Sequence, residues 1–250
     1  MRLPVGKLEP EFLAELLGGL HADDPAVIVG PGIGRDVTVL AWDANERYLI
    51  AKTDPITFAT DAIGYYAVNV NANDVATSGG VPRWFLATLL LPAGATDEAL
   101  VRSIFAQIDA ACRELGISLV GGHTEVTHDL DRPVLVGFML GEVGKSELVV
   151  GDGAQVGDRL LLTKGVAIEG TSIIARELRD DLLARGVDVE TVRRAAGFLH
   201  EPGISVLREA RIAVTAGTVH AMHDPTEGGL ATGLHELAMA SGVGLEVDEA

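Results

Sequence analysis

The sequence contains a single cysteine, Cys112, in 250 residues. One cysteine cannot form an internal disulfide, so the chain is not a disulfide-stabilised secreted domain, and we expect it in the reducing cytoplasm. Cys112 lies among periodic apolar positions, where a small buried hydrophobic side chain is far more common than a nucleophile.

Long apolar runs and an excess of positive charge are also lacking. The longest apolar runs, such as "WFLATLLLP", are too short to span a bilayer, and the start "MRLPVGKLEPEFL" lacks the apolar block of a secretory signal. The formal net charge of −17 argues against nucleic-acid binding, because phosphate repels such a surface. An anionic ligand would need a metal ion or a local cationic pocket.

Several familiar motifs are absent or misplaced. There is no Walker A sequence and no Gly-x-Ser-x-Gly nucleophile elbow. The "GPGIG" stretch precedes a strand-like "DVTVL", whereas a dinucleotide fingerprint requires a helix there. The pairs His123 with His128 and His220 with His223 have no cysteine beside them, so their spacing does not favour zinc.

The patterns that are present predict an α/β (α+β) protein of two domains. A glycine- and aspartate-rich segment, 151–158, predicts a boundary between residues 1–153 and 154–250. In the first part, strands are predicted over 36–43, 47–54, 83–91, 117–122 and 133–143. Helices are predicted over 10–20, from the Thr60-Asp61 start to the Gly-Gly-Val-Pro stop at 79–82, and over 96–115. In the second part, helices are predicted near 168–185, 189–199, 203–211 and 227–241, and strands near 159–163, 218–222 and 243–247. With only three obvious strands, either the sheet of the second domain is small or the domain is incomplete in this sequence, and we expect the second.

The stretch "YYAVNVNANDVATSGGVP" is an apolar helix that carries three amides and a carboxylate. Asn and Asp are poor helix formers, because their side chains compete for backbone hydrogen bonds. We hypothesise that this face of the helix lines a cleft. The alternative is that Asn71 and Asp74, three residues apart, bond to one another on a solvated face.

Carboxylates in three separate segments suggest a magnesium site. Asp36 enters a strand, Asp54 follows Lys52 at a strand end, and Asp74 lies in the helix. Mg²⁺ takes oxygen ligands and leaves positions for water or phosphate. Lys52 is our candidate for a phosphate contact. Taken singly, each has an ordinary explanation: Asp36 as a turn cap, Asp54 in a turn with Pro55, and Lys52 as a surface lysine.

Two further short segments of the sequence, which we call stations, combine glycines with polar residues. In "LVGGHTEVTHD", a glycine turn after a strand carries His123, Thr124 and Glu125. In "HAMHDPTEGGLATGLHELAMASGVG", a strand leads through Asp224 to the Gly228-Gly229 pair and a helix, and free amides at a helix start can bind phosphate. An ordinary helix start capped by Thr226 would explain the same residues.

The order of these motifs resembles the aminoimidazole ribonucleotide (AIR) synthetase, or PurM-like, superfamily. The quoted order is GxGxD, KTDP, VNxND, Gly-x-Pro, a strand ending in LP, GGxT and DPTxGGL. Within that group, "NDVATSGGVPRWFLATLLLP" and "DPTEGGLATGLHELA" are most similar to HypE-like hydrogenase maturation proteins. The match spans most of the chain.

The resemblance implies a PurM-like fold whose N-terminal domain pairs with its twin in a β-barrel-like dimer core. It implies that ATP and Mg²⁺ lie in a cleft at the dimer. The residues expected to hold the metal are Asp36, Asp54 and Asp74. Those expected to bind the nucleotide are Asn73, Asp74, Gly121, Gly122, Thr124, Asp224, Gly228 and Gly229.

The chain departs from the pattern of the family at one motif. The usual GGDT is Gly121-Gly122-His123-Thr124 here, and Glu125 is our candidate for the missing carboxylate oxygen. We assign catalytic roles to Lys52, His123 and Glu125. HypE acts on a carboxy-terminal cysteine, whereas this sequence ends at Ala250, which we attribute either to truncation or to loss of that reaction.

The predicted function is an ATP- and Mg²⁺-dependent enzyme that phosphorylates or dehydrates an amide, carbamoyl or similar small acceptor. The alternatives are a purine-type cyclo-ligase and a non-catalytic nucleotide-binding assembly factor. The expected partners are a second copy of the chain, the small acceptor and a maturation protein, without nucleic acid or membrane.

Overall fold

The computed structural model describes residues 24–32, 35–42, 46–59 and 61–247, together with residues 11, 12, 14 and 16. The predicted helix over 10–20 lies mostly outside the described residues. No helix among the described residues is long and apolar enough to cross a membrane.

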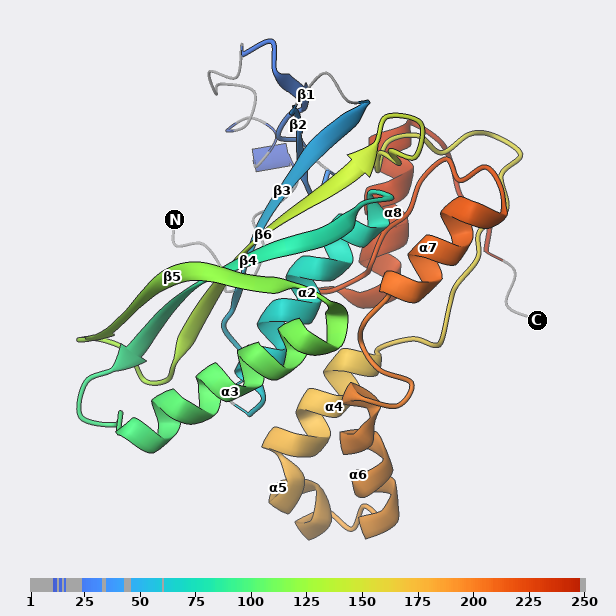
Figure 1. Cartoon of the computed structure of the whole chain (residues 1–250). Coiled ribbons are helices and arrows are strands. Elements are labelled where there is room, and N and C mark those ends of the chain that lie inside the picture. Colours follow the sequence, from blue (N-terminus) through green and yellow to red (C-terminus); the bar gives the residue numbers. More distant parts are fainter. Residues whose placement is uncertain are drawn as a thin grey trace.

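One six-stranded sheet organises the first part of the chain (Figure 1). Its strands are β1 (Val27–Val29), β2 (Thr38–Ala41), β3 (Arg47–Ile56), β4 (Val81–Pro92), β5 (Ser118–Thr127) and β6 (Val134–Gly144). Their order is β1-β2-β3-β6-β4-β5, and every adjacent pair is antiparallel except the parallel pair β4–β5. Strands β2, β3, β4 and β6 fall where the sequence predicted them, whereas β1 was not predicted and β5 extends to Thr127, beyond the predicted 117–122.

Two helices cover the sheet and enclose the core. Helix α2 (Ile63–Thr77) packs against β3 and β6, and α3 (Glu98–Leu115) packs beside α2. Asp97 caps α3 by accepting from the Leu100 N–H, and Gly116 ends it in the left-handed conformation. Cys112 is buried in this core, as expected for a small apolar side chain.

Helix α2 is buried on nearly all sides rather than along one stripe. Every residue from Ile63 to Thr77 is buried except Tyr65. The expectation of a polar face on a cleft is therefore wrong for Asn71, which is fully enclosed. The alternative of a solvated Asn71–Asp74 pair is wrong too, because both residues are buried.

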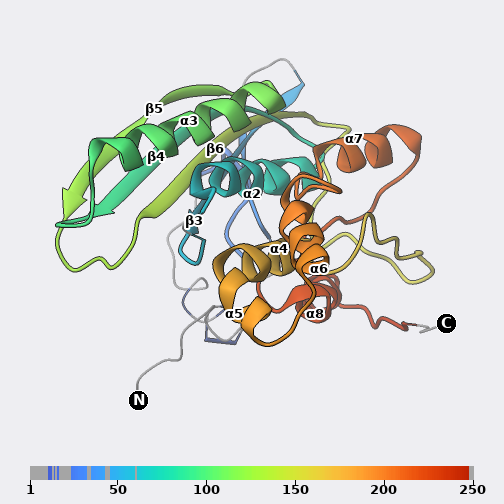
Figure 2. The ribbon, with the colours of Figure 1, turned by 90° about the horizontal axis from the view of Figure 1, so that it is seen from below.

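In the described residues of the second part, all regular secondary-structure elements are helices or 3₁₀ turns. They are α4 (Ile168–Glu177), α5 (Arg179–Ala184), α6 (Val189–Ala196), the 3₁₀ turn η1 (Gly197–Leu199), α7 (Leu207–Ala216) and α8 (Gly229–Ser241). The predicted helix 168–185 is divided at Leu178, where the backbone leaves the helical conformation. Figure 2 shows α4, α5 and α6 together on the helical side of the sheet.

The strands predicted near 159–163, 218–222 and 243–247 are not formed in the described part of the chain. A strand satisfies its backbone groups through a neighbouring strand, and none of these segments pairs with another described residue. Leu161, in the first of these segments, is consequently 87% exposed. The mixed α/β fold class is confirmed, while the boundary at residue 153 stays a prediction.

Candidate functional site

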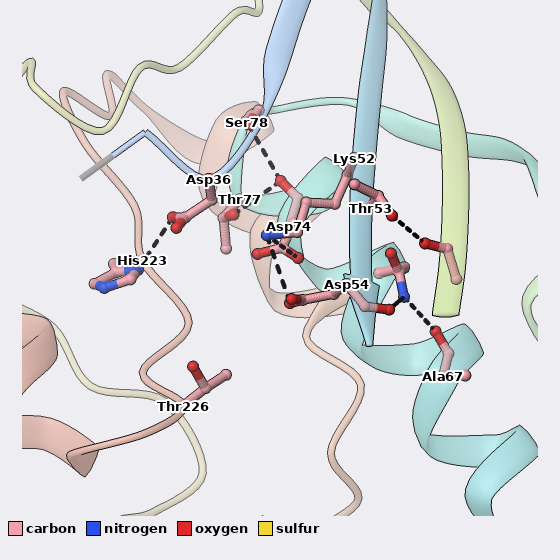
Figure 3. A network of polar contacts seen from close by, with 12 residues as sticks. Asp36, Lys52, Thr53, Asp54, Ala67, Asp74, Thr77, Ser78, His223 and Thr226 are labelled. Atoms are coloured by element: carbon pink, nitrogen blue, oxygen red, sulfur yellow. Dashed lines mark hydrogen bonds and ion pairs between the residues drawn. The ribbon is translucent and has the colours of Figure 1, made fainter. Parts of the chain in front are cut away.

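Lys52 lies at the centre of the polar cluster that the sequence predicted. It projects from β3, and its Nζ lies 3.1 Å from Oδ2 of Asp74 on α2 and 3.5 Å from Oδ2 of Asp54 on the same strand (Figure 3). Only 15% of the Lys52 side chain is exposed. The surface-lysine alternative is therefore wrong, and Lys52 joins two of the three predicted metal-binding carboxylates.

Negative charge dominates the electrostatics of this cluster. Burial alone lowers the pKa of Lys52, but the carboxylates of Asp74, Asp54 and Asp36 outweigh it, and the net shift is upward. Burial raises the pKa of Asp74 to about 7, with Asp36 and Asp54 adding to the shift and Lys52 opposing it. The three carboxylates thus raise one another's affinity for positive charge, whether it is carried by a proton or by a cation.

Asp36 lies beside a second group that comes from the segment before α8. The Nδ1 atom of His223 is 3.2 Å from Oδ2 of Asp36, and its Nε2 atom is 2.8 Å from Oε2 of Glu236 on α8. Ligand atoms of Asp36, His223 and Asp224 all lie within 4.8 Å of one another. Sequence reasoning named Asp36 and Asp224, set His223 aside because its spacing did not favour zinc, and missed Glu236.

Asp224 contributes to this cluster a carboxyl group with one fully buried oxygen atom. The residue as a whole is half-buried, but its Oδ1 atom is inaccessible to solvent and has no hydrogen-bond partner. Burial, together with the carboxylates of Asp74 and Asp36, raises the pKa of Asp224 well above its usual range. An enclosed carboxylate oxygen without a donor fits a cation, and the oxygen-rich donor set fits Mg²⁺.

The amides of α2 bind backbone rather than solvent. Asn71 donates from Nδ2 to the Ala67 carbonyl at 2.8 Å and to the Asp54 carbonyl at 3.3 Å. Asn73 donates to the Ile204 carbonyl and accepts from the Val206 N–H, both at 2.9 Å. Both polar atoms of Asn73 are thus engaged in joining α2 to the segment before α7.

Residues 121–125, Gly-Gly-His-Thr-Glu, form a segment that we call the GGHTE station. Within one chain this segment lies apart from Lys52. It forms the middle of β5 rather than a turn, and a Cβ on Gly122 would lie 2.0 Å from the Ala87 carbonyl oxygen, so the close approach of β4 requires glycine. Asp54 pairs with Gly137, Gly137 with Ala87, and Ala87 with Gly122. Three strand spacings place Gly122 about 14 Å from Asp54.

The side chains of this station are turned outward. His123 Nε2 lies 3.0 Å from Oε2 of Glu125, and the two side chains are 62% and 49% exposed. Gly121 and Thr124 are exposed on the same strand. The structure does not bring these residues to the Lys52 cluster of the same chain.

The Gly228-Gly229 pair begins α8 without a side-chain cap. Both glycines have positive φ, 83° and 62°, and no side chain accepts from the first turn. Thr226 instead donates to Glu227 at 3.1 Å, so the predicted Thr226 cap is wrong. The first amides of α8 are the kind of group that binds phosphate.

Glu169 is a second functional candidate that sequence reasoning missed. It lies in the first turn of α4, and burial, followed by the charges of Glu227 and Asp54, raises its pKa to about 7. Its only sequence signal is a carboxylate between the apolar and glycine residues of "VAIEG".

Comparison with known proteins matches both parts of the chain. The model of the AIR synthase related protein N-terminal domain matches residues 22–143, and that of the C-terminal domain matches residues 155–250. Carbamoyl dehydratase HypE of Cupriavidus necator is 33% identical over 223 residues, which are 87% of this chain and 60% of that protein. Selenide, water dikinase of Bordetella bronchiseptica is 32% identical, over 98% of this chain and 68% of that protein.

Solved structures give the same fold. The hydrogenase maturation protein HypE in complex with ATP matches with a TM-score of 0.63 and 26% identity, over 90% of this chain and 60% of that one. The ThiL protein complexed with AMPPCP and TMP matches with a TM-score of 0.67 and 23% identity, over 84% and 65%. The chain thus spans 60% of the length of its HypE relative.

Proposed function

Since the chain belongs to the AIR synthase related protein family, we propose that it is an ATP- and Mg²⁺-dependent enzyme that activates a carbamoyl, amide or similar small acceptor oxygen. The family includes a carbamoyl dehydratase and selenide, water dikinases among its relatives, and both names support ATP-driven activation of a small acceptor. The HypE structure in complex with ATP supports the choice of nucleotide.

One observation carries this proposal: carboxylates from separate segments gather around Lys52. Asp36, Asp54 and Asp74 come from three segments, and Lys52 is the cation that faces them. A divalent cation bound by these residues would supply the missing positive charge and, when present, neutralise phosphate oxygens. Phosphoryl transfer depends mainly on such placement and charge neutralisation, so the protein needs no covalent nucleophile.

The residues of the chain take distinct roles in this proposal. Asp36, Asp54, Asp74 and Asp224 hold the cation, and Lys52 keeps Asp54 and Asp74 in place and reaches phosphate. The Gly229 N–H already donates to the Thr226 carbonyl, so the following amides of the first turn of α8 would bind a phosphate group. Asn73 acts indirectly, because its two hydrogen bonds fix the position of α2 against the second part.

The proposal includes a homodimer, which would account for the GGHTE station. His123, Thr124 and Glu125 lie about 14 Å from the Lys52 cluster of their own chain, at the open edge of the sheet. They can contribute to a nucleotide site only if β5 of a second copy approaches that cluster. The exposed residues of β5, from Ser118 to Val126, offer the surface for this contact.

A maturation protein is the further partner in this proposal. A solved HypE–HypF complex, 21% identical to this chain in its matched part, shares the fold. The existence of that complex supports a partner protein for this chain as well. The proposal places both proteins in the cytoplasm.

The first test is nucleotide binding. We expect ATP to raise the melting temperature of the wild-type chain when Mg²⁺ is present and to have little effect in EDTA. Asp74→Asn removes a charge without changing shape, and it should abolish the Mg²⁺-dependent shift. Asp109→Asn, on the exposed face of α3, is the matched control and should behave as wild type.

The second test is turnover. ADP formation that depends on an added carboxamide or on selenide would establish the enzyme, and the accepted compound would define its class. Nucleotide binding without ADP formation would favour the assembly-factor alternative. If the Asp74→Asn variant binds ATP and Mg²⁺ as tightly as wild type, the assignment of Asp74 to this site is wrong.

A further inference from the structure

A pocket of about 250 Å³ lies where β3 begins and β6 ends, away from the Lys52 cluster. Arg47 is the first residue of β3, five positions before Lys52, so the two side chains point to opposite faces of the sheet. Figure 1 shows α7 beside this end of β6, and Arg211 of α7 lines the pocket together with residues of β3, β4 and β6. Both parts of the chain therefore form this pocket, and the Lys52 cluster does not belong to it.

Three guanidinium groups and two carboxylates line the pocket. Nη1 of Arg47 donates to Oε2 of Glu142 at 2.9 Å. Nη1 of Arg211 donates to Oε1 of Glu147, also at 2.9 Å. The third guanidinium, that of Arg83, lies 3.6 Å from the Glu142 oxygen that Arg47 already binds, which is too long for a hydrogen bond. The pocket thus has one surplus positive charge, in a chain whose net charge is −17.

The position of Arg83 follows from an irregularity of β4. The pairing of β4 with β6 changes register between Pro82 and Trp84, so Arg83 is the extra residue of a β-bulge. A bulge redirects a side chain that regular pairing would place elsewhere. Among the described residues, Arg83 has an ion pair with Glu142 but no hydrogen bond. Its side chain is 45% exposed, so its donors are accessible to a ligand.

Apolar side chains form another part of the wall. Val81, at the start of β4, lines the pocket and is 39% exposed, and Val143 of β6 lines it as well. Drug-sized ligands occupy pockets of about 300–1,000 Å³, so a pocket of this size suits a smaller molecule. The lining accordingly offers a guanidinium for an anionic group and an apolar surface for a short alkyl group.

We propose that this pocket binds a small organic monocarboxylate, with its carboxylate on Arg83 and its alkyl group against Val81. The planar guanidinium matches a carboxylate with two parallel hydrogen bonds. One negative charge balances the surplus positive charge. A phosphate monoester carries close to two negative charges near neutral pH, which would leave excess negative charge beside Glu142 and Glu147. This inference goes beyond ATP use and does not depend on it.

The test uses the full chain without nucleotide or Mg²⁺, with butyrate as the probe and saturation-transfer NMR to measure its affinity. We expect wild type to bind butyrate, and Arg83→Gln to bind it at least about tenfold more weakly, because the charged donor is lost. Arg113→Gln is the matched control, since Arg113 is an exposed arginine paired with Asp109 on α3, outside the pocket. This control should bind butyrate as wild type does.

Glu142→Gln should have the opposite effect. It removes the carboxylate that competes for Arg47 and Arg83, and it raises the surplus to two positive charges. Butyrate affinity should therefore rise by about threefold. A variant that fails to fold cannot produce this gain, so the pair of substitutions separates binding from stability. An unchanged or lower affinity in Glu142→Gln would contradict the role of the surplus charge.

Three further outcomes would overturn the proposal. Butyramide, the neutral analogue, should not compete, and equal binding of butyrate and butyramide would show that no charge is recognised. Inorganic phosphate that binds more tightly than butyrate, and loses affinity in Arg83→Gln, would assign the pocket to another ligand class. Wild type that does not bind butyrate, with an oligomeric state that changes in Arg83→Gln, would show by analytical ultracentrifugation that the arginines belong to a contact between copies.

Discussion

At the scale of single residues, Lys52 holds together carboxylates that would otherwise repel one another. Its Nζ lies between Asp54 and Asp74, and Asp36 adds a third negative charge nearby. Removing one partner of a buried ion pair leaves the other charge uncompensated, and this usually destabilises a protein more than the pair itself stabilised it.

Lys52→Met should therefore destabilise the metal-free chain by about 3 kcal/mol. Saturating Mg²⁺ should recover part of this loss, because the cation replaces the missing positive charge. Urea unfolding with and without Mg²⁺ measures both effects. Lys145→Met, on a more exposed lysine that lies 4.0 Å from Glu46, is the control and should change little. If Lys52→Met and Lys145→Met lowered the free energy of unfolding equally, the role given to Lys52 would be contradicted.

At the scale of elements, α2 is the part that connects the two halves of the chain. Two of its buried amides, Asn71 and Asn73, satisfy backbone groups of other segments, which explains why these poor helix formers stand in this helix. Asn73 bonds to Ile204 and Val206, whereas Asn69 bonds only within the helix, to the Tyr65 carbonyl.

Asn73→Ala should cost about 2–3 kcal/mol of unfolding free energy, because it leaves buried backbone groups of the second part without partners. Asn69→Ala, another buried amide in the same helix, should cost about 1 kcal/mol. Hydrogen exchange should also show faster exchange around residues 204–206 in Asn73→Ala alone. Equal effects of the two substitutions would argue against a clamp between the halves.

The contact of α2 with the sheet depends on Gly137 of β6. A Cβ at this position would lie 2.2 Å from Nδ2 of Asn71 and 2.8 Å from the Phe85 ring. Gly137→Ala should therefore destabilise the chain by about 1–3 kcal/mol through overpacking. Gly170→Ala in α4 meets no atom within 4 Å and should stabilise by up to about 1 kcal/mol. Thermal unfolding of the two variants should show shifts of opposite sign.

At the scale of the whole molecule, the buried acids make stability depend on pH. The pKa values of Asp74 and Glu169 are raised to about 7 from 3.8 and 4.5, mainly by burial. Between these values the folded chain retains protons that the unfolded chain has released, so stability falls as pH rises. Burial lowers the pKa of His223, but Asp36 and Glu236 outweigh it and raise the pKa, so this stabilisation too is lost as pH rises through the raised pKa.

We expect the metal-free chain to lose at least about 2 kcal/mol of stability between about pH 5 and pH 8. A bound divalent cation replaces these protons, so saturating Mg²⁺ or Mn²⁺ should flatten the decline and stabilise more at pH 8 than at pH 6. Urea unfolding across this range measures the slope, and Asp74→Asn should have a shallower one. A stability that rises toward pH 8 without metal would contradict these pKa shifts.

The sequence by itself determined the elements of the first part and the residues of the charged cluster. The strands β2, β3, β4 and β6 and the helices α2 and α3 follow from local periodicity, which depends only on neighbours along the chain. Asp36, Lys52, Asp54, Asp74 and Asp224 were found because carboxylates interrupt otherwise apolar segments. The motif order also identified the family, which the matched domains confirm.

Only the tertiary structure decided which polar residues meet. It turned Asn73 toward the backbone before α7, added His223 and Glu236 to the carboxylates, and kept the GGHTE station three strands away from Lys52. It also left the predicted strands of the second part unpaired. The physical reason is common to all four cases: a side-chain contact or a strand pairing joins residues far apart in sequence, so local patterns do not determine it.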